Sequence, residues 1–452
     1  MAFKYKALLL LILGIYVGFT LKYITGFNET SGIDFTPPKP EASSLRIPDF
    51  FSNDSRFSLI DNHITRYLNR YQLAGASVAI AKDGKTVFAK GYGYADKENE
   101  TAVESYHLFR IASISKLITA TGIMKLVEEE RLSLDDKVFG DIGILNHAPY
   151  NDYFDNRAEK IEVRHLLNHS GGWTTRWGDP MFIPHVIAQA KQKKLPVSDE
   201  DIITFMLGKR LHFEPGSMSS YSNLGYAILG KVIEKVSGLN YETFIKTRIL
   251  YPLGIFDMQL GGSFSYERLH TEVKYYEPVS EDPRLVEDFL GLGEKVPCSY
   301  GGNDIKTLGA AGGWVASAPD LLRFMLAIDG DASQPDILSK ESVEIMANHD
   351  MNEFETLGWR GIDKESRYRT GTLSGTSTLM VCRDDGISYV ILFNSSSWKG
   401  STFFSNQTKK MMNRAITQID EWPDYDLFEL ASSVNRINPN VGVIVHRIKQ
   451  EQ

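Results

Sequence analysis

Cysteine is scarce in this chain. Only Cys298 and Cys382 occur among its 452 residues, and neither has companions at the spacing of a metal site. The two thiols can pair if the protein is exported, or both can be buried and free, and the sequence leaves this choice open. A cysteine-ligated metal centre is therefore not expected.

Long blocks of like charge are absent as well. The chain has 49 basic and 57 acidic residues, a net charge of -8 at pH 7, and no run long enough for a polyanion-binding tail. We therefore expect no nucleic-acid partner. With 42% hydrophobic, 11% aromatic and 23% charged residues, the composition is that of an ordinary globular protein. The length suits one large domain with an insertion, or about two to three smaller domains.

The N-terminus differs in kind from the rest. Residues 7–21 are uncharged and apolar, with Lys4 and Lys6 before them and Lys22 after them, which fits a signal-peptide core or a short signal anchor. Because no convincing small-x-small cleavage site follows, an anchor with its positive end inside is favoured over a cleaved signal peptide. The flanking lysines and the polar, proline-containing stretch that follows fit a membrane boundary better than a buried N-terminal helix. We expect residues 1–27 to form this segment and the bulk of the chain to be exported, to a periplasmic or extracellular location.

Composition also predicts the domain boundaries. Residues 28–50 are rich in Thr, Pro, Ser, Gly and Glu and are typical of a linker. Residues 51–422 are expected to form the folded domain, and residues 423–452 a tail. Near the start of the domain, residues 57–71 have the period of an amphipathic helix.

Two hairpins are predicted at opposite ends of this domain. The β-prone residues 76–81 and 86–91 flank one turn, and residues 376–382 and 387–393 flank another at Asp384-Asp385-Gly386. The second hairpin follows Arg369-Thr370-Gly371, which we expect near a strand start.

A Ser-x-x-Lys tetrad, Ser113-Ile114-Ser115-Lys116, precedes a run of helix-compatible residues. If Ser113 opens a helix, Lys116 shares its face and its amine can approach the hydroxyl. An amine with a pKa near ~10.4 can take the hydroxyl proton only if burial or a positive neighbour lowers that pKa. The free N-H groups of a helix start also favour negative charge. Alone, such a tetrad is usually a helix N-cap with a solvated lysine.

A second stretch, Tyr221-Ser222-Asn223, follows a turn and precedes an apolar-periodic helix over residues 224–236. At a helix start, Tyr221 and Asn223 can both face a cleft, although a lone tyrosine is more often a core residue with a satisfied hydroxyl. His165 and His169 also have a spacing that can bind zinc. With no Glu after the first histidine and no obvious third ligand, packing is the favoured role of both.

Together, the three stretches resemble the serine beta-lactamase and penicillin-binding-protein superfamily, most closely its class C beta-lactamase, D-aminopeptidase and esterase branch. The motifs stand in the family's order, and the resemblance covers roughly residues 57–394. It implies an α+β fold in which helices flank an antiparallel sheet built from chain before Ser113 and after about Ala311. A helical subdomain, about residues 117–310, is inserted between these parts, and the cleft lies between sheet and insertion.

The resemblance also implies a role for each motif residue. Ser113 is the acylated nucleophile, Lys116 its proton partner and Tyr221 a second base or proton shuttle. The backbone N-H groups of Ser113 and Thr372 form the oxyanion hole, and no metal or cofactor is needed. The expected substrate-binding residues are Asn223, which hydrogen-bonds the substrate amide, with Arg369, Thr370 and Gly371.

Arg369 departs from the family, which usually has Lys or His at this position. Arginine cannot pass a proton, but its planar fork binds carboxylates well. In the cleft it favours a substrate with a terminal carboxylate, whereas toward solvent it indicates nothing, and strand alternation leaves both open.

We therefore expect an exported serine hydrolase that cleaves an amide or ester, of D-peptide, ester or beta-lactam type, through an acyl-enzyme on Ser113. The motifs do not separate these small-molecule or peptide substrates. Two alternatives remain: a non-catalytic binder of peptidoglycan or of a partner protein on the same fold, and an acyltransferase. The oligomeric state is open.

Overall fold

The computed structural model describes residues 43–277, 284–331, 335–347, 356–363, 365–396 and 401–437. The predicted signal segment and most of the predicted linker lie outside these ranges, as does the end of the predicted tail. Across the ranges described, none of the helices combines the length and the apolar character needed to cross a bilayer. The described residues, from Ser43 onward, belong to one compact unit.

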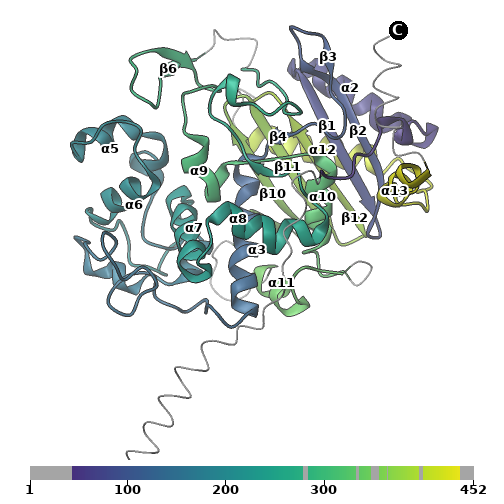
Figure 1. The fold of residues 1–452 in the computed structure, drawn as a ribbon. Coiled ribbons are helices and arrows are strands. Elements are labelled where there is room, and N and C mark those ends of the chain that lie inside the picture. Colours follow the sequence, from purple (N-terminus) through teal and green to yellow (C-terminus); the bar gives the residue numbers. More distant parts are fainter. Residues whose placement is uncertain are drawn as a thin grey trace, which may run out of the picture. The chain divides into compact units, whose positions relative to one another are not determined.

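A mixed-order antiparallel sheet of seven strands dominates this part (Figure 1). The strand order is β3-β2-β1-β12-β11-β10-β9. β1 pairs antiparallel with β12 from Ala76 opposite Phe393 to Lys82 opposite Ile387, so the two predicted hairpins are joined edge to edge. The bounds are β1 Gly75–Lys82, β2 Lys85–Asp96, β3 Thr101–Ala102, β9 Gly361–Asp363, β10 Ser366–Leu373, β11 Thr376–Arg383 and β12 Ile387–Phe393.

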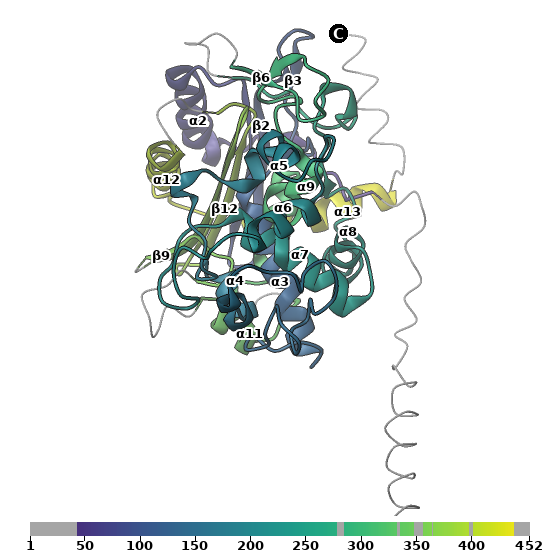
Figure 2. The same ribbon diagram turned by 90° about the vertical axis from the view of Figure 1, so that its left-hand side faces the viewer.

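Helices cover both faces of the sheet, which explains why β1 and β12 are apolar along almost their whole length rather than alternating. Figure 2 shows α2 and α12 on one side of the sheet and α3 on the other. On the first side, Ile60, Ile64 and Tyr67 of α2 pack with Met412 of α12. On the other side, the apolar residues of α3 and α10 form a second core. These helices are α2 Ser58–Tyr71, α3 Ser115–Glu128, α10 Ala318–Leu326 and α12 Ser401–Ile416.

A largely helical region is inserted between β4 and β8, and in Figure 1 its helices α5, α6 and α7 lie beside the sheet on the side of β10. Its helices are α4 Val163–Leu167, α5 Pro184–Ala190, α6 Asp199–Leu207, α7 Asn223–Ser237, α8 Tyr241–Ile245 and α9 Ile305–Gly312. β4 Phe109–Arg110 and β5 Gln259–Leu260 flank β8 Trp314–Ala316 in a small sheet, and β6 Leu285–Glu287 pairs with β7 Lys295–Pro297. α11 Lys340–Ala347 follows the insertion. The expected α+β fold, an antiparallel sheet flanked by helices with a helical insertion, is confirmed.

Single-turn elements connect these parts. They are η1 Asp49–Ser52, η2 Ser55–Phe57, η3 Ala112–Ile114, η4 Asn156–Lys160, η5 Thr175–Trp177, η6 Pro180–Phe182, the π-turn η7 Lys246–Leu250, η8 Tyr251–Leu253 and η9 Ser265–Glu267.

Three features were not predicted from the sequence. Residues 427–437, within the expected tail, form helix α13 Leu427–Ile437, because the apolar side chains of Leu427 and Ala431 share one helix face and are buried beside Ile47. The β6–β7 hairpin lies in a stretch of low periodicity. Cys298 and Cys382 are unpaired thiols.

Candidate active site

Ser113 lies in a tight turn between β4 and α3. Where the sequence predicted that Ser113 opens an α-helix, it stands in the 3-10 turn η3, and α3 begins two residues later at Ser115. Ala112 immediately before it has a φ of +47°, a left-handed conformation that costs energy in a residue with a Cβ. α3 is buried on almost all sides, so Ser113 stands at the entrance of a helix enclosed by protein.

A buried polar network fixes the strand that leads to Ser113. The Arg110 guanidinium lies 4.3 Å from the Tyr275 ring centre and donates to Ser299 O and Gly262 O at 2.6 and 2.8 Å. The Arg110 N-H donates to Tyr275 Oη at 2.8 Å, and this hydroxyl donates to Glu272 Oε1 at 2.6 Å. Burial raises the pKa of Glu272 above its ordinary value, although the Arg110 charge opposes this effect.

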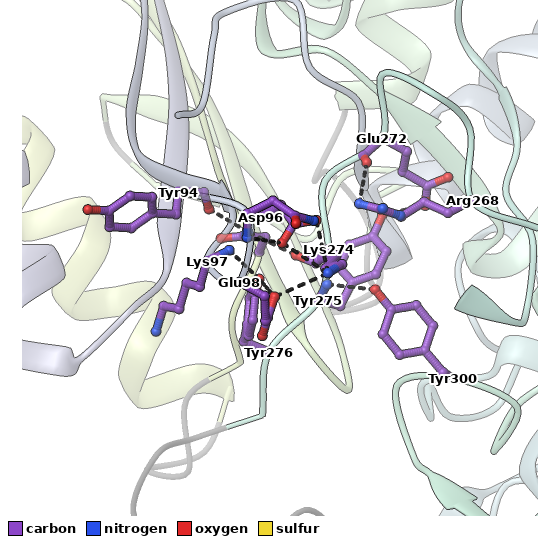
Figure 3. A network of polar contacts seen from close by, with 12 residues as sticks. Tyr94, Asp96, Lys97, Glu98, Arg268, Glu272, Lys274, Tyr275, Tyr276 and Tyr300 are labelled. Atoms are coloured by element: carbon purple, nitrogen blue, oxygen red, sulfur yellow. Dashed lines mark hydrogen bonds and ion pairs between the residues drawn. The ribbon is translucent and has the colours of Figure 1, made fainter. Parts of the chain in front are cut away.

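The segment that contains Glu272 and Tyr275 is also bound to the seven-stranded sheet, through Lys274. Figure 3 shows Lys274 reaching Asp96 and Glu98, next to Tyr275 and Tyr300. Lys274 Nζ donates to Asp96 Oδ1 at 2.9 Å and to Glu98 Oε2 at 3.2 Å. Burial favours the neutral form of Asp96, but the hydrogen bonds from Lys274 and Asn99 together outweigh it and hold the pKa of this carboxyl below its usual value. The network therefore connects β4 to the end of β2.

Tyr221 and Asn223 reach the site because Ser222 caps the start of α7. The Ser222 Oγ accepts from Gly225 N at 3.0 Å, which leaves the residues on either side of it free to face Ser113 and Lys116. The Tyr221 hydroxyl donates to Ser113 Oγ at 2.6 Å. Lys116 Nζ donates to Asn223 Oδ1 at 2.6 Å and lies 3.4 Å from Ser113 Oγ. Four residues predicted from two separate motifs thus lie in one hydrogen-bonded group.

Lys116 is completely buried, and a backbone carbonyl supplies its third contact. Its Nζ donates to Ala311 O at 2.5 Å, at the end of α9. Three acceptors match the three donors of an ammonium group, which allows the charge to be carried in the protein interior.

β10 brings the third motif against η3. A Cβ at Gly371 would lie 2.2 Å from Ile111 O and 3.0 Å from Ser113 N, so only glycine permits this approach. From the next strand, Thr376 Oγ1 donates to Arg110 O at 2.8 Å and Thr378 Oγ1 to Ile111 O at 3.0 Å. The backbone that precedes Ser113 is therefore held by β10 and β11 together. Arg369 to Thr372 lie within β10, rather than near the start of the strand that follows.

The register of β10 indicates where the Thr372 N-H points. On the β9 side of the strand, Tyr368 O accepts from Arg360 N at 3.0 Å. Backbone groups alternate between the two edges of a strand, so residues two or four apart face the same edge. Thr372 is four residues beyond Tyr368, and β9 pairs with β10 only up to Tyr368. The Thr372 N-H therefore faces away from β11, on the edge that adjoins η3.

Arg369 is 1% exposed and points into the site. Its Nε donates to Ser113 O at 3.0 Å and its Nη1 to Trp359 O at 3.2 Å. Nη2 is buried and has no hydrogen-bond partner among the residues that the structure describes. The alternative in which Arg369 faces solvent is thereby excluded.

Burial and the positive charges together determine the pKa values of the site. Burial lowers the pKa of Lys116 and the charge of Arg369 lowers it further, whereas a charge on Tyr221 raises it. Burial alone would raise the pKa of Tyr221, but the charges of Lys116 and Arg369 outweigh it and lower this pKa to about 8. Because phenol and amine interact so closely, their proton belongs to the pair.

His169 stays neutral behind this pair. Burial, with the charges of Arg369, Lys116 and Arg360, holds the pKa of His169 well below its ordinary value, and its Nδ1 accepts from Ser222 N at 3.2 Å. His165 Nδ1 accepts from Glu162 N instead. Within the ranges described, no group of three potential metal ligands occurs.

A cavity of about 420 Å³ opens over these residues. It is lined by Ser113, Tyr221, Asn223, Arg369, Thr370 and Thr372, with Phe182, Leu308 and Leu373 as apolar wall. A larger hollow of about 670 Å³ in the helical region contains none of the predicted site residues. Its Lys193 is already paired with Asp201. The smaller cavity is therefore the one that contains the candidate nucleophile and its hydrogen-bond partners.

Two residues at this site were missed by the sequence analysis. Asp179 Oδ2 accepts from Asn223 Nδ2 at 2.7 Å, and the exposed Arg360 lies 5.4 Å from the Tyr221 ring centre. Both stand on connecting segments without periodicity. The Asp-Pro step at Asp179 indicates a turn, but no local signal shows which residue the carboxylate contacts.

Comparisons with known proteins cover most of the chain. A family model described as Beta-lactamase matches residues 60–407. Penicillin-binding protein 4* of Bacillus subtilis (strain 168) is 30% identical over 325 residues, and the match spans 69% of this chain and 66% of that protein, slightly under two thirds of its length.

Solved structures share the fold. The octameric penicillin-binding protein homologue from Pyrococcus abyssi is 28% identical, with a TM-score of 0.58 over 80% of this chain and 78% of that chain. The D-amino acid amidase from Ochrobactrum anthropi SV3, in complex with L-phenylalanine amide, is 24% identical, with a TM-score of 0.61 over 81% of this chain and 98% of that chain.

Proposed function

Because the chain belongs to the beta-lactamase family of serine hydrolases, we propose that it hydrolyses an amide or an ester through an acyl-enzyme on Ser113. The observation that carries the proposal is the contact of Ser113 Oγ with a phenol and an amine, Tyr221 Oη at 2.6 Å and Lys116 Nζ at 3.4 Å. A serine placed between a phenol and an amine of lowered pKa has the activation that acyl transfer requires.

The reaction proceeds in two displacements. In the first, the Tyr221 and Lys116 pair, having lost one proton, takes the proton of Ser113 as Oγ attacks the substrate carbonyl carbon. The oxyanion is stabilised by the N-H groups of Ser113 and Thr372. The bond to the leaving group then breaks, and the pair returns the proton to the leaving amine or alcohol. In the second, water attacks the acyl-enzyme by the same route and releases the acid.

The charge around the cavity favours an anionic substrate. Arg369 and Lys116 are buried beside Ser113, and Arg360 stands exposed at the rim. A carboxylate near the scissile bond, as in a D-peptide or a beta-lactam, is attracted by all three charges. The name of the Bacillus subtilis relative accords with this substrate class. Asn223, with its oxygen on Lys116, keeps one N-H for the substrate amide.

The test is the intact mass of the protein after exposure to a penicillin and, separately, to a fluorophosphonate. We expect one adduct that is absent from the Ser113→Ala variant. A lasting penicillin adduct indicates a peptidase-like site, and phosphonylation without penicillin capture indicates an esterase or rapid beta-lactam turnover. The absence of any adduct would favour the non-catalytic binder.

An acyltransferase uses the same acyl-enzyme but a different acceptor. Product analysis with and without an added alcohol or amine separates the two reactions, because a transferase forms the acceptor ester or amide in preference to the free acid. We favour hydrolysis because Ser113 is half-buried and lines the cavity, so water can reach an acyl group on its Oγ.

We also propose that the domain is exported and held at a membrane by residues 1–27. The support is the lysine-flanked apolar run in the sequence. Fractionation of cells that produce the full chain tests this proposal: the protein should pellet with membranes and be accessible to protease from outside the cytoplasm.

A further inference from the structure

The side-chain amide of Asn223 has to be oriented correctly for Lys116 to be held against Ser113. An amide can turn over and exchange its oxygen and nitrogen, and only its hydrogen-bond partners decide the orientation. Lys116 requires the oxygen, because a charged amine only donates. The nitrogen end lies 2.7 Å from the carboxylate of Asp179, which only accepts. Amine and carboxylate thus impose the same orientation from opposite ends.

Asp179 is itself fixed by the backbone that follows it. It is the N-cap of η6, and its Oδ1 accepts from Met181 N at 3.0 Å, while Oδ2 faces Asn223. Pro180 and Met181 beyond it are buried. The two carboxylate oxygens therefore have separate tasks, one within the turn and one at the site.

Asp179 also supplies negative charge to a site that is otherwise cationic. Its charge is among those acting on the Lys116 amine, and it opposes the effects of burial and of Arg369. The other titratable or charged groups around the Lys116 and Tyr221 pair come from β10, the segment before β9, the loop after α4 and helix α7. They are Arg369, Arg360, His169 and Tyr226.

We propose that Asp179 is a positioning residue of this enzyme, which acts through the Asn223 amide to hold Lys116 against Ser113 and offsets the positive charge of the site. This inference rests on the proposed hydrolase function. Asp179 does not touch the reacting atoms, so its effect must pass through Asn223 and through its charge.

The test is the pH dependence of kcat/KM for an activated ester such as p-nitrophenyl acetate, measured on the full chain. We expect Asp179→Asn to lower kcat/KM by about 10- to 100-fold, the effect typical of a residue that orients a functional group. We also expect the acid limb to move to lower pH, because the proton of the pair is lost more easily without the neighbouring negative charge.

The matched control is Asp54→Asn. Asp54 likewise caps a 3-10 turn, η2, and accepts from Arg56 N at 2.9 Å, but it has no contact with the site. The Asp54→Asn variant should leave both kcat/KM and the acid limb unchanged. If Asp179→Asn does not fold, Asp179→Ser replaces it in the same assay. Serine keeps an oxygen for the Met181 N-H and removes the charge.

A double variant shows whether Asp179 acts through Asn223. In an Asn223→Ala background, Asp179→Asn should lower kcat/KM by less than threefold, because the amide that Asp179 orients is gone. The inference would be overturned if Asp179→Asn lowers kcat/KM as much in this background as in the wild type. It would also be overturned if the acid limb does not move, or if both Asp179 variants fail to fold. Absence of Ser113-dependent turnover in the wild-type protein is a separate result, which refutes the proposed function and this inference with it.

Discussion

Replacing Arg369 by methionine tests the electrostatic account of the site most directly. Burial raises the pKa of Tyr221 and lowers that of Lys116, whereas the charge of Arg369 lowers both. Without this charge both pKa values rise, and the pair keeps its proton to higher pH. Since the pair must lose one proton before it can accept that of Ser113, the acid limb of kcat/KM should move to higher pH.

The size of the effect follows from the separation of the charges. The guanidinium carbon of Arg369 lies 5.9 Å from the centre of the Tyr221 ring. At this distance, two unit charges interact by roughly 2.8 kcal/mol with an effective dielectric constant of about 20, which corresponds to about two pH units. Tyr221 is partly exposed where it lines the cavity, so screening by solvent reduces the expected displacement to roughly one to two pH units.

The assay is kcat/KM for an activated ester between about pH 5.5 and pH 10, with the spontaneous rate subtracted. Arg369→Lys keeps the charge, so its acid limb should stay close to that of the wild type even if kcat falls. Arg367→Met is the matched control, since Arg367 lies on the same strand but donates to Asp329 O, outside the cavity. An acid limb that stays in place or moves to lower pH in Arg369→Met would refute the reasoning.

Two further predictions concern packing. Gly371→Ala forces a Cβ into the backbone of η3, so it should destabilise the fold by about 1–3 kcal/mol in thermal unfolding and abolish Ser113 labelling. The control is Gly208→Ala, whose Cβ would meet no atom closer than 3.5 Å. It should change neither the stability nor the labelling. Leu427→Ala should lower the free energy of unfolding by about 2–5 kcal/mol, because the buried side chain is lost. Leu430 is exposed on the same helix, and Leu430→Ala should change the free energy of unfolding by less than about 0.5 kcal/mol. Equal effects of the two substitutions in denaturant titrations would contradict the packing of α13.

The elements that could be predicted are those whose cause is local. The β1–β2 and β11–β12 hairpins follow from apolar runs around turn residues, and α2 from its 3.6-residue period. Ser113, Lys116, Tyr221 and Asn223 stand out because their spacing within short motifs has a chemical reason. The structure brings these four side chains together, and their catalytic roles stay a prediction until Ser113 is labelled.

What could not be predicted depends on contacts between distant segments. The direction of Arg369 is decided by Ser113 O, 256 residues earlier in the chain, and strand alternation alone allows either face. Asp179 is unremarkable as an Asp-Pro turn until α7 places Asn223 beside it. α13 was missed because its apolar stripe is short and gains its stability from β2 and residue Ile47 rather than from helix propensity.

The same long-range contacts make the nucleophile dependent on the whole sheet. The backbone before Ser113 is held by Thr376 and Thr378 of β11, and β11 reaches its place only because β12 pairs with β1. Lys116, in turn, is held by Ala311 O and by Asn223 of the inserted region. Neither the sheet nor the insertion positions the serine and its proton acceptors by itself. Reactivity of Ser113 toward a fluorophosphonate should therefore be lost in step with global unfolding, without a separate transition at lower denaturant concentration.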